Sequence, residues 1–116
     1  MALSYFLNRK KTTCVITFKG SLTLNDVETL EACLKEARAE PAQYYILNLA
    51  GVVEVEPNAS RPFTLFQHGL RSGSKLYLCD VQPEPERVLK SSGVLREGEL
   101  CPDLLSCLQA ILQAEK

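Results

Sequence analysis

Residues 44–60, YYILNLAGVVEVEPNAS, decide the fold of this chain. The first part, residues 44–49, is a short apolar run that predicts a β-strand, which residues 52–55 extend only briefly. A polar loop follows, and the sequence PNAS at residues 57–60 marks the place where we expect a helix to begin. In open α/β folds, ligands bind where strands end and lead into helices. We therefore expect the working surface of the protein at this corner.

The segments around this stretch alternate between strand-like and helix-like patterns. Strands are expected at residues 3–7, 12–18 and 75–81, with a hairpin turn at 8–11 and a weak edge strand at 94–100. Apolar spacing and start signals predict helices at 26–39, after 58–62, at 86–91 and from 102 onward. This order predicts an α/β fold: a mixed, mostly parallel sheet of four to five strands, with an N-terminal β-hairpin and about four helices packed mainly on one face. No linker or repeat interrupts it, so we expect a single domain over residues 1–116.

Local rules also predict where the elements begin and end. Gly20 is expected to end the second strand, and Asn25 is expected to cap the first helix, because Glu28 stands at the spacing of a capping box. The final helix is expected to bury one apolar stripe, which consists of Leu104, Leu105, Leu108, Ile111 and Leu112.

The charge balance excludes two classes of partner. The chain carries 13 basic and 14 acidic side chains, a formal net charge of −1, and so lacks the basic face that nucleic acids or anionic membranes attract. No apolar run approaches the roughly 18–20 residues that span a bilayer. The N-terminus, MALSYFLNRKK, has its apolar part before its basic part, the reverse of a secretory signal. We therefore expect no direct contact with nucleic acid, no membrane insertion and a cytoplasmic location.

No group of residues predicts an active site or a metal site. The five cysteines are odd in number and lack CxxC spacing, which favours reduced core thiols over disulfides or a metal centre: Cys14, Cys33, Cys79, Cys101 and Cys107. His68 is the one histidine and is expected on the second helix as a surface residue or one at the edge of the core. Glu54 and Glu56 could share a strand face as a carboxylate pair, but a solvated acidic loop is the better interpretation. With no glycine-rich phosphate loop either, we expect neither an enzyme nor a cofactor.

Four segments occur together in an informative order. They are FKGSLT at residues 18–23, ILNL at 46–49, LYLCDV at 76–81 and VLKSSGV at 88–94. Their sequences and spacing resemble the STAS domain, the fold of bacterial anti-sigma factor antagonists. The resemblance covers about residues 3–112 and implies a regulatory protein-binding role without catalysis.

The resemblance breaks down at the position that the family phosphorylates. The family has D-S-[ST]-G at the start of the second helix, and a partner kinase phosphorylates the Ser or Thr. Here the sequence is EPNA at residues 56–59: the acid is kept as Glu56, and the phosphoacceptor position falls on Pro57 or Asn58, which cannot be phosphorylated. Ser60 is the nearest hydroxyl, and it is either the helix N-cap or a displaced phosphoacceptor. Arg61 either extends along the surface or reaches an acidic partner.

Three functions remain open at this point. The resemblance implies docking to an anti-sigma factor or another histidine-kinase-like ATPase, without the usual phosphorylation switch, through these residues: Ser21, Thr23, Glu54, Glu56, Pro57, Asn58, Ser60 and Arg61. The alternative is a structural subunit of a larger complex such as a transporter assembly. The third function, a small-ligand sensor, would require a cavity. The oligomeric state is also open, and a homodimer is one alternative.

Overall fold

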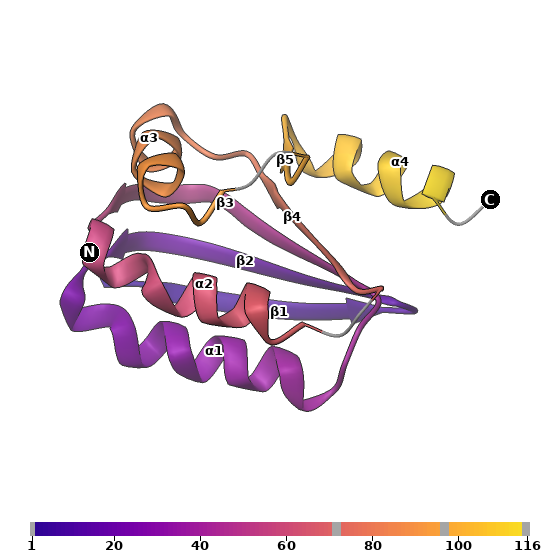
Figure 1. The fold of residues 1–116 in the computed structure, drawn as a ribbon, viewed down its shortest axis with the longest axis horizontal. Coiled ribbons are helices and arrows are strands. Elements are labelled where there is room, and N and C mark those ends of the chain that lie inside the picture. The colour runs from indigo at the N-terminus through magenta and orange to yellow at the C-terminus, as the bar shows by residue number, and fades with distance from the viewer. Residues whose placement is uncertain (1, 71–72, 96–97, 115–116) are drawn as a thin grey trace.

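The structure is a computed structural model that describes residues 2–70, 73–95 and 98–114. In this part of the chain a five-stranded sheet has the strand order β1-β2-β3-β4-β5 (Figure 1). The strands are β1 (Ser4–Lys10), β2 (Thr13–Leu22), β3 (Tyr44–Val55), β4 (Lys75–Cys79) and β5 (Leu100–Cys101). The β1–β2 pair is antiparallel and the other three pairs are parallel, which confirms the predicted mixed sheet with an N-terminal hairpin.

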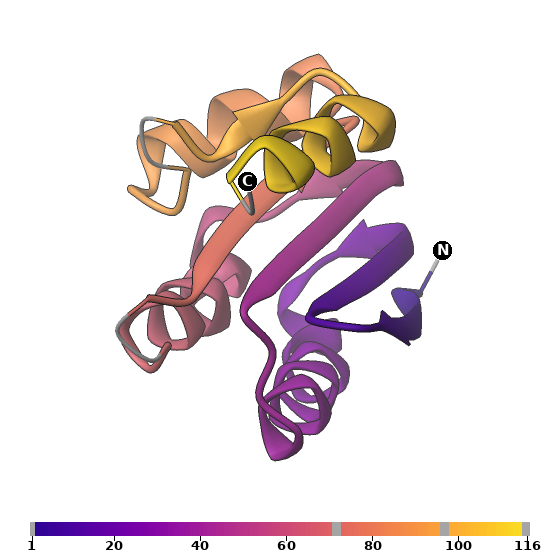
Figure 2. The ribbon, with the colours of Figure 1, turned by 90° about the vertical axis from the view of Figure 1, so that its right-hand side faces the viewer.

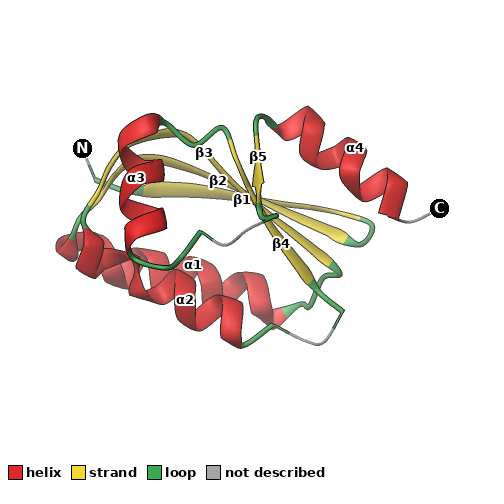
Figure 3. Cartoon of the chain, turned by 45° about the horizontal axis from the view of Figure 1, so that its top comes forward, coloured by secondary structure: helices red, strands yellow, loops and turns green. Residues whose placement is uncertain are grey.

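Helices cover both faces of this sheet unequally. They are α1 (Val27–Ala39), α2 (Arg61–His68), α3 (Pro83–Ser91) and α4 (Leu104–Ala114), with short 3-10 turns η1 (Leu24–Asp26) and η2 (Pro57–Ser60). Side chains of α1, α2 and α3 join the larger apolar cluster, whereas α4 belongs to a smaller, separate cluster. Figure 2 shows α4 on the opposite side of the sheet from α1 and α2. Figure 3 shows α1 and α2 side by side, with α3 and α4 toward opposite ends of the sheet.

The alternation of side chains along β3 explains the two clusters. Tyr45 and Leu47 point into the larger cluster, and Tyr44 and Ile46 point into the smaller one. Successive strand residues face opposite sides of a sheet, so a central strand covered on both sides must be apolar at every position. The run at residues 44–49 is the sequence signature of this arrangement.

The strand β2 extends further than the sequence predicts, and β3 runs without a break to the end of the extension expected at residues 52–55. Gly20 does not end β2: the strand continues to Leu22 through a register irregularity at which Gly20 has a φ of 101°. Glycine adopts this left-handed conformation without steric cost, so the strand bends there instead of stopping. The predicted hairpin turn at 8–11 is shorter than expected, because Asn8 pairs with Val15 and Arg9 with Cys14. No helix among the described residues is long and apolar enough to cross a bilayer.

Two helix starts differ from the prediction. The cap of the first helical segment is Thr23, whose capping-box partner is Asp26, and the predicted pair of Asn25 and Glu28 is wrong. The third helix starts at Pro83, three residues earlier than predicted, because proline fits the first turn of a helix. The predicted edge strand at 94–100 is reduced to β5, and its residues 96 and 97 lie outside the described part of the chain.

The final helix buries a different stripe from the predicted one. Cys107 and Ile111 are its buried residues, and Leu104 packs partly against the same cluster. Leu105, Leu108 and Leu112 are 65%, 37% and 62% exposed. The helix contacts the sheet along one narrow line with i, i+4 spacing, so the leucines beside that line stay in solvent.

Candidate functional site

The ends of β2 and β3 bring the two predicted binding segments together. In the parallel register Ser21 pairs with Glu54 and Leu22 pairs with Val55, and the Glu56 N–H donates to the Leu22 carbonyl over 2.9 Å. We call residues 21–24 and 53–61 the corner. It lies at one end of the sheet, where β3 leads into α2 (Figure 1).

A carboxylate holds the first half of the corner. Oδ2 of Asp26 accepts hydrogen bonds from the backbone N–H of Thr23, at 3.0 Å, and from its hydroxyl, at 2.8 Å. Oδ1 of Asp26 accepts from the Leu3 N–H at 3.2 Å. These donors, the Thr23 hydroxyl above all, lower the pKa of Asp26, because they stabilise its charged form. The Thr23 hydroxyl is therefore engaged within the chain.

Ser60 does not cap α2 in the predicted manner. Its hydroxyl donates to the Pro57 carbonyl over 2.7 Å instead of accepting from a backbone N–H. Its backbone is already helical because the 3-10 turn η2 runs directly into α2, whereas an N-cap residue keeps an extended backbone. The side chain is 1% exposed.

The eight predicted site residues divide by exposure. Glu54, Pro57, Asn58 and Arg61 are exposed, Thr23 and Glu56 are half-buried, and Ser21 and Ser60 are buried. The exposed members come from the end of β3 through the start of α2, so this segment forms the accessible part of the corner.

Sequence reasoning missed three exposed apolar side chains next to these residues. Leu24 and Val53 are each 57% exposed and follow or precede a predicted site residue in the chain. Leu65 is 55% exposed and lies one helical turn after Arg61. Single exposed apolar residues are common, but here Leu24 and Val53 lie within the corner and Leu65 lies one turn beyond it.

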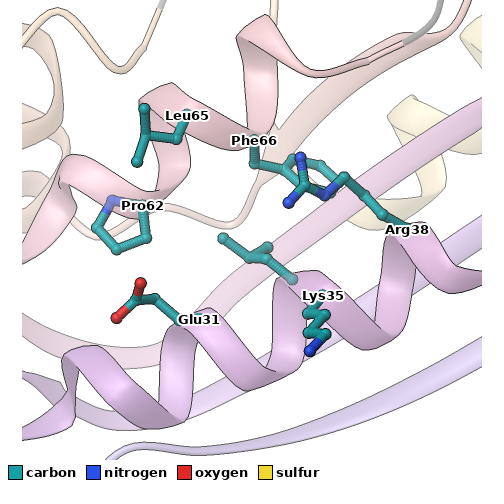
Figure 4. Close-up of a pocket in the computed structure, with 7 residues that line it drawn as sticks. Glu31, Lys35, Arg38, Pro62, Leu65 and Phe66 are labelled. Carbon is teal, nitrogen blue, oxygen red and sulfur yellow. The ribbon is translucent and has the colours of Figure 1, made fainter.

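A groove runs from the corner between α1 and α2. Its volume is about 280 Å³, and it is lined by Glu31, Leu34, Lys35, Arg38, Pro62, Leu65 and Phe66 (Figure 4). The Arg38 guanidinium lies 6.0 Å from the centre of the Phe66 ring, a cation–π distance. The groove therefore has an apolar side formed by α2 and a charged side formed by α1.

The core itself leaves little room for a small ligand. The apolar cavity among Leu3, Phe18, Leu22, Leu49, Val52, Val55, Phe63 and Leu89 has a volume of about 10 Å³. Ligand pockets usually measure about 300–1,000 Å³. In the described part of the chain no cluster of His, Cys, Asp and Glu is arranged to hold a metal ion, and His68 is exposed at the end of α2.

Comparison with known proteins agrees with this architecture. A family model of the STAS domain matches residues 6–106. Among solved structures, an anti-sigma factor antagonist from Mycobacterium paratuberculosis is similar with a TM-score of 0.86 and 14% identity, over 96% of this chain and 95% of the other. An anti-sigma-factor antagonist (STAS) domain protein from Planctomyces limnophilus gives a TM-score of 0.76 and 20% identity, over 96% and 98% of the two chains.

A transporter-related protein is also similar. A sulfate transporter family protein from Wolinella succinogenes gives a TM-score of 0.74 and 18% identity, over 90% of this chain and 89% of the other. No curated protein sequence matches the chain. At these identities the structural likenesses establish the fold, and the partner must be argued from the corner.

Proposed function

Because the chain belongs to the STAS domain family, we propose that it is a non-enzymatic regulatory domain that binds an anti-sigma factor or another histidine-kinase-like ATPase through the corner. The observation that carries this proposal is the set of exposed side chains at Glu54, Pro57, Asn58 and Arg61, in a segment held at the end of the sheet by pairing of β3 with β2. The close fit to an anti-sigma factor antagonist over 96% of the chain supports the same role. We place this activity in the cytoplasm.

The proposed binding does not depend on phosphorylation. Pro57 and Asn58 have no hydroxyl, and the hydroxyl of Ser60 is buried and bonded to the Pro57 carbonyl. A phosphate on Ser60 would add about two negative charges beside Glu56 and would require the buried side chain to leave its site. The complex is therefore expected to form without this switch.

The docking surface is tested with matched substitutions. Asn58→Arg adds bulk and charge to the exposed corner, and Asn8→Arg makes the same change on exposed β1, outside the corner. Binding to purified anti-sigma-type ATPases from the same genome is measured by calorimetry. We expect Asn58→Arg to weaken binding by roughly tenfold or more, about 1.4 kcal/mol, and Asn8→Arg to leave it unchanged. Equal affinities for the two variants would place the interface elsewhere.

The missing switch is tested separately. The wild-type chain and Ser60→Ala are incubated with the ATPase partner and radiolabelled ATP. We expect no radiolabel on the wild-type chain or on the Ser60→Ala variant. Label on the wild-type chain that disappears in Ser60→Ala would show that Ser60 is a phosphoacceptor, and the switch-free interpretation would be wrong.

A transporter assembly is the second candidate. The similarity to a sulfate transporter family protein supports this candidate. In it, the STAS domain would be one part of a membrane complex. Affinity purification of the wild-type chain from its own cells distinguishes the two functions. Specific recovery of an anion transporter or an ABC-type ATPase, reduced by Asn58→Arg, would favour this candidate over the first.

A homodimer is a separate question. Analytical sedimentation of the purified chain tests for it.

A further inference from the structure

Three of the five cysteines meet beneath the last helix. Cys79 on β4 and Cys101 on β5 are register partners in neighbouring parallel strands. Cys107 of α4 lies with Cys79 in the small buried apolar cluster, and Cys101 packs against the same cluster. All three are free thiols. Three separate elements therefore bring these cysteines into one cluster.

The three thiols differ in their access to solvent. Cys79 and Cys107 are 0% exposed, whereas Cys101 is only half-buried. Its chain neighbours Leu100 and Pro102 are exposed, so a small solute can approach this edge of the sheet. The cluster thus has one half-buried cysteine at the sheet edge and two fully buried ones.

Two features favour one pair of these cysteines for a disulfide, a bond that needs Cα atoms about 4.4–6.8 Å apart. Cys101 packs against the cluster that contains Cys107. Only residues 102–106 separate Cys101 from Cys107, so bond formation requires movement of one short connection. Cys79 lies in the covered strand β4, whose backbone is held between β3 and β5. Cys107 is therefore the better partner for Cys101.

We propose that Cys101 and Cys107 form an oxidation site, in which a hydroperoxide reacts at Cys101 and Cys107 closes an intrachain disulfide. The Cys101 sulfur attacks one oxygen of hydrogen peroxide, the O–O bond breaks, and a sulfenic acid and one water form. The Cys107 sulfur then attacks the Cys101 sulfur, and the departing hydroxide takes the Cys107 proton as a second water. The two thiols lose two electrons in total, and the peroxide gains them.

Protonation at Cys107 agrees with this division of roles. The neighbouring Cys79 thiol, burial and the neighbouring Cys101 thiol raise the pKa of Cys107, so Cys107 keeps its proton at neutral pH. Peroxides react with thiolates, and a buried thiol that keeps its proton is a poor first target. Cys107 is therefore expected to act only in the second step, once the neighbouring sulfur has become electrophilic.

Two buried cysteines elsewhere in the chain serve as an internal control for the oxidation experiment. Cys14 on β2 and Cys33 on α1 are both 0% exposed, and burial raises the pKa of both thiols, that of Cys33 to about 12. This pair has no half-buried member. Cys14 and Cys33 are therefore expected to stay reduced under conditions that oxidise Cys101.

The test is oxidation of the reduced, full-length chain with hydrogen peroxide, followed by alkylation after unfolding and non-reducing peptide mapping. Trypsin leaves Cys101 and Cys107 in one peptide, residues 97–116, and Cys79 in another, residues 76–87. We expect the 97–116 peptide to lose two hydrogen atoms and both alkyl groups. Cys14 and Cys33 should remain fully alkylated.

Variants then separate the two steps. Cys107→Ser should leave a sulfenic acid on Cys101 that dimedone traps, and Cys101→Ser should prevent formation of the disulfide. Because Cys101 is half-buried, Cys101→Ser is expected to keep the fold, which circular dichroism checks. The proposal is overturned if Cys101 is alkylated as completely as Cys14 and Cys33 in the wild-type chain. It is also overturned if the peptides 76–87 and 97–116 are cross-linked instead.

Discussion

At the scale of single residues, Asp26 connects the start of the chain to the corner. Its two carboxylate oxygens accept hydrogen bonds from Leu3 and Thr23, so one side chain fixes both the approach to β1 and the turn after β2. The residue is 7% exposed, and its three donors stabilise the ionised form. The geometry of the first half of the corner therefore depends on the charge of Asp26.

We predict that Asp26→Asn lowers the free energy of unfolding at neutral pH. The free energy of unfolding of the variant should also depend less on pH than that of the wild-type chain. The folded-state pKa of Asp26 lies below its value in an unfolded chain, about 3.9, so its contribution is complete above that value. This contribution is lost as the pH falls through the folded-state pKa. Urea unfolding at pH 7 and pH 3 measures both effects. An equal pH dependence in the two proteins would contradict the role given to Asp26.

At the scale of secondary-structure elements, β2 and β3 approach closely where the corner begins. A Cβ atom at Gly51 would lie 2.9 Å from Cγ of Lys19 and 3.0 Å from the carbonyl oxygen of Phe18. The register of the two strands shifts at this point, between Thr17 and Lys19. A residue without a side chain is needed opposite the shift, because the backbone of Phe18 cannot move as a flexible side chain would.

We predict that Gly51→Ala destabilises the chain by about 1–3 kcal/mol, the usual cost of overpacking. Ala50→Ser changes the exposed neighbour and should alter stability by no more than about 0.5 kcal/mol. Urea denaturation of the three proteins gives the comparison. If Gly51→Ala is as stable as the wild-type chain, the two strands are not packed as tightly as described.

The contact line of α4 gives a second prediction at this scale. Ile111 is 4% exposed and Leu112 is 62% exposed, although both belong to the stripe expected from the sequence. We expect Ile111→Ala to cost about 2–5 kcal/mol through the lost burial and the cavity, and Leu112→Ala to cost about 0.5 kcal/mol or less. Urea denaturation of the two variants and the wild-type chain measures these changes in the free energy of unfolding. Equal losses would mean that the broader apolar stripe is buried after all.

At the scale of the whole molecule, the two apolar clusters differ greatly in size. The larger one joins β1–β4 to α1, α2 and α3, and the smaller one joins β3 and β4 to α4 with few buried side chains. Local opening free energy follows the amount of buried apolar contact. The molecule is therefore expected to loosen first at its C-terminal helix.

Native-state hydrogen exchange measures this difference. We predict that amides of α4 exchange fastest among the helices of the described chain and that amides of β2 and β3 exchange slowest. The ladder between β2 and β3 lies in the middle of the sheet and opens only with the whole fold. Protection of α4 equal to that of β3 would contradict the weaker role of the small cluster.

The sequence by itself determined the order of elements, the sheet and the family. The apolar run at 44–49 predicts a central strand because every side chain on it must be buried, and strand–helix alternation implies parallel pairing. The segments FKGSLT, ILNL, LYLCDV and VLKSSGV resemble the family whose model matches residues 6–106. These properties depend on local chemistry and periodicity, which are written directly in the chain.

The accessibility of residues and the contacts between distant residues follow from tertiary packing alone. Ser60 was expected at a helix end and is instead buried with its hydroxyl bonded to Pro57, while Leu112 was expected in the buried stripe and is exposed. Cys101 and Cys107 show no sequence motif, yet two strands and a helix bring them together with Cys79. Exposure and contact between distant residues depend on how elements pack against one another, and local propensity carries no information about that packing.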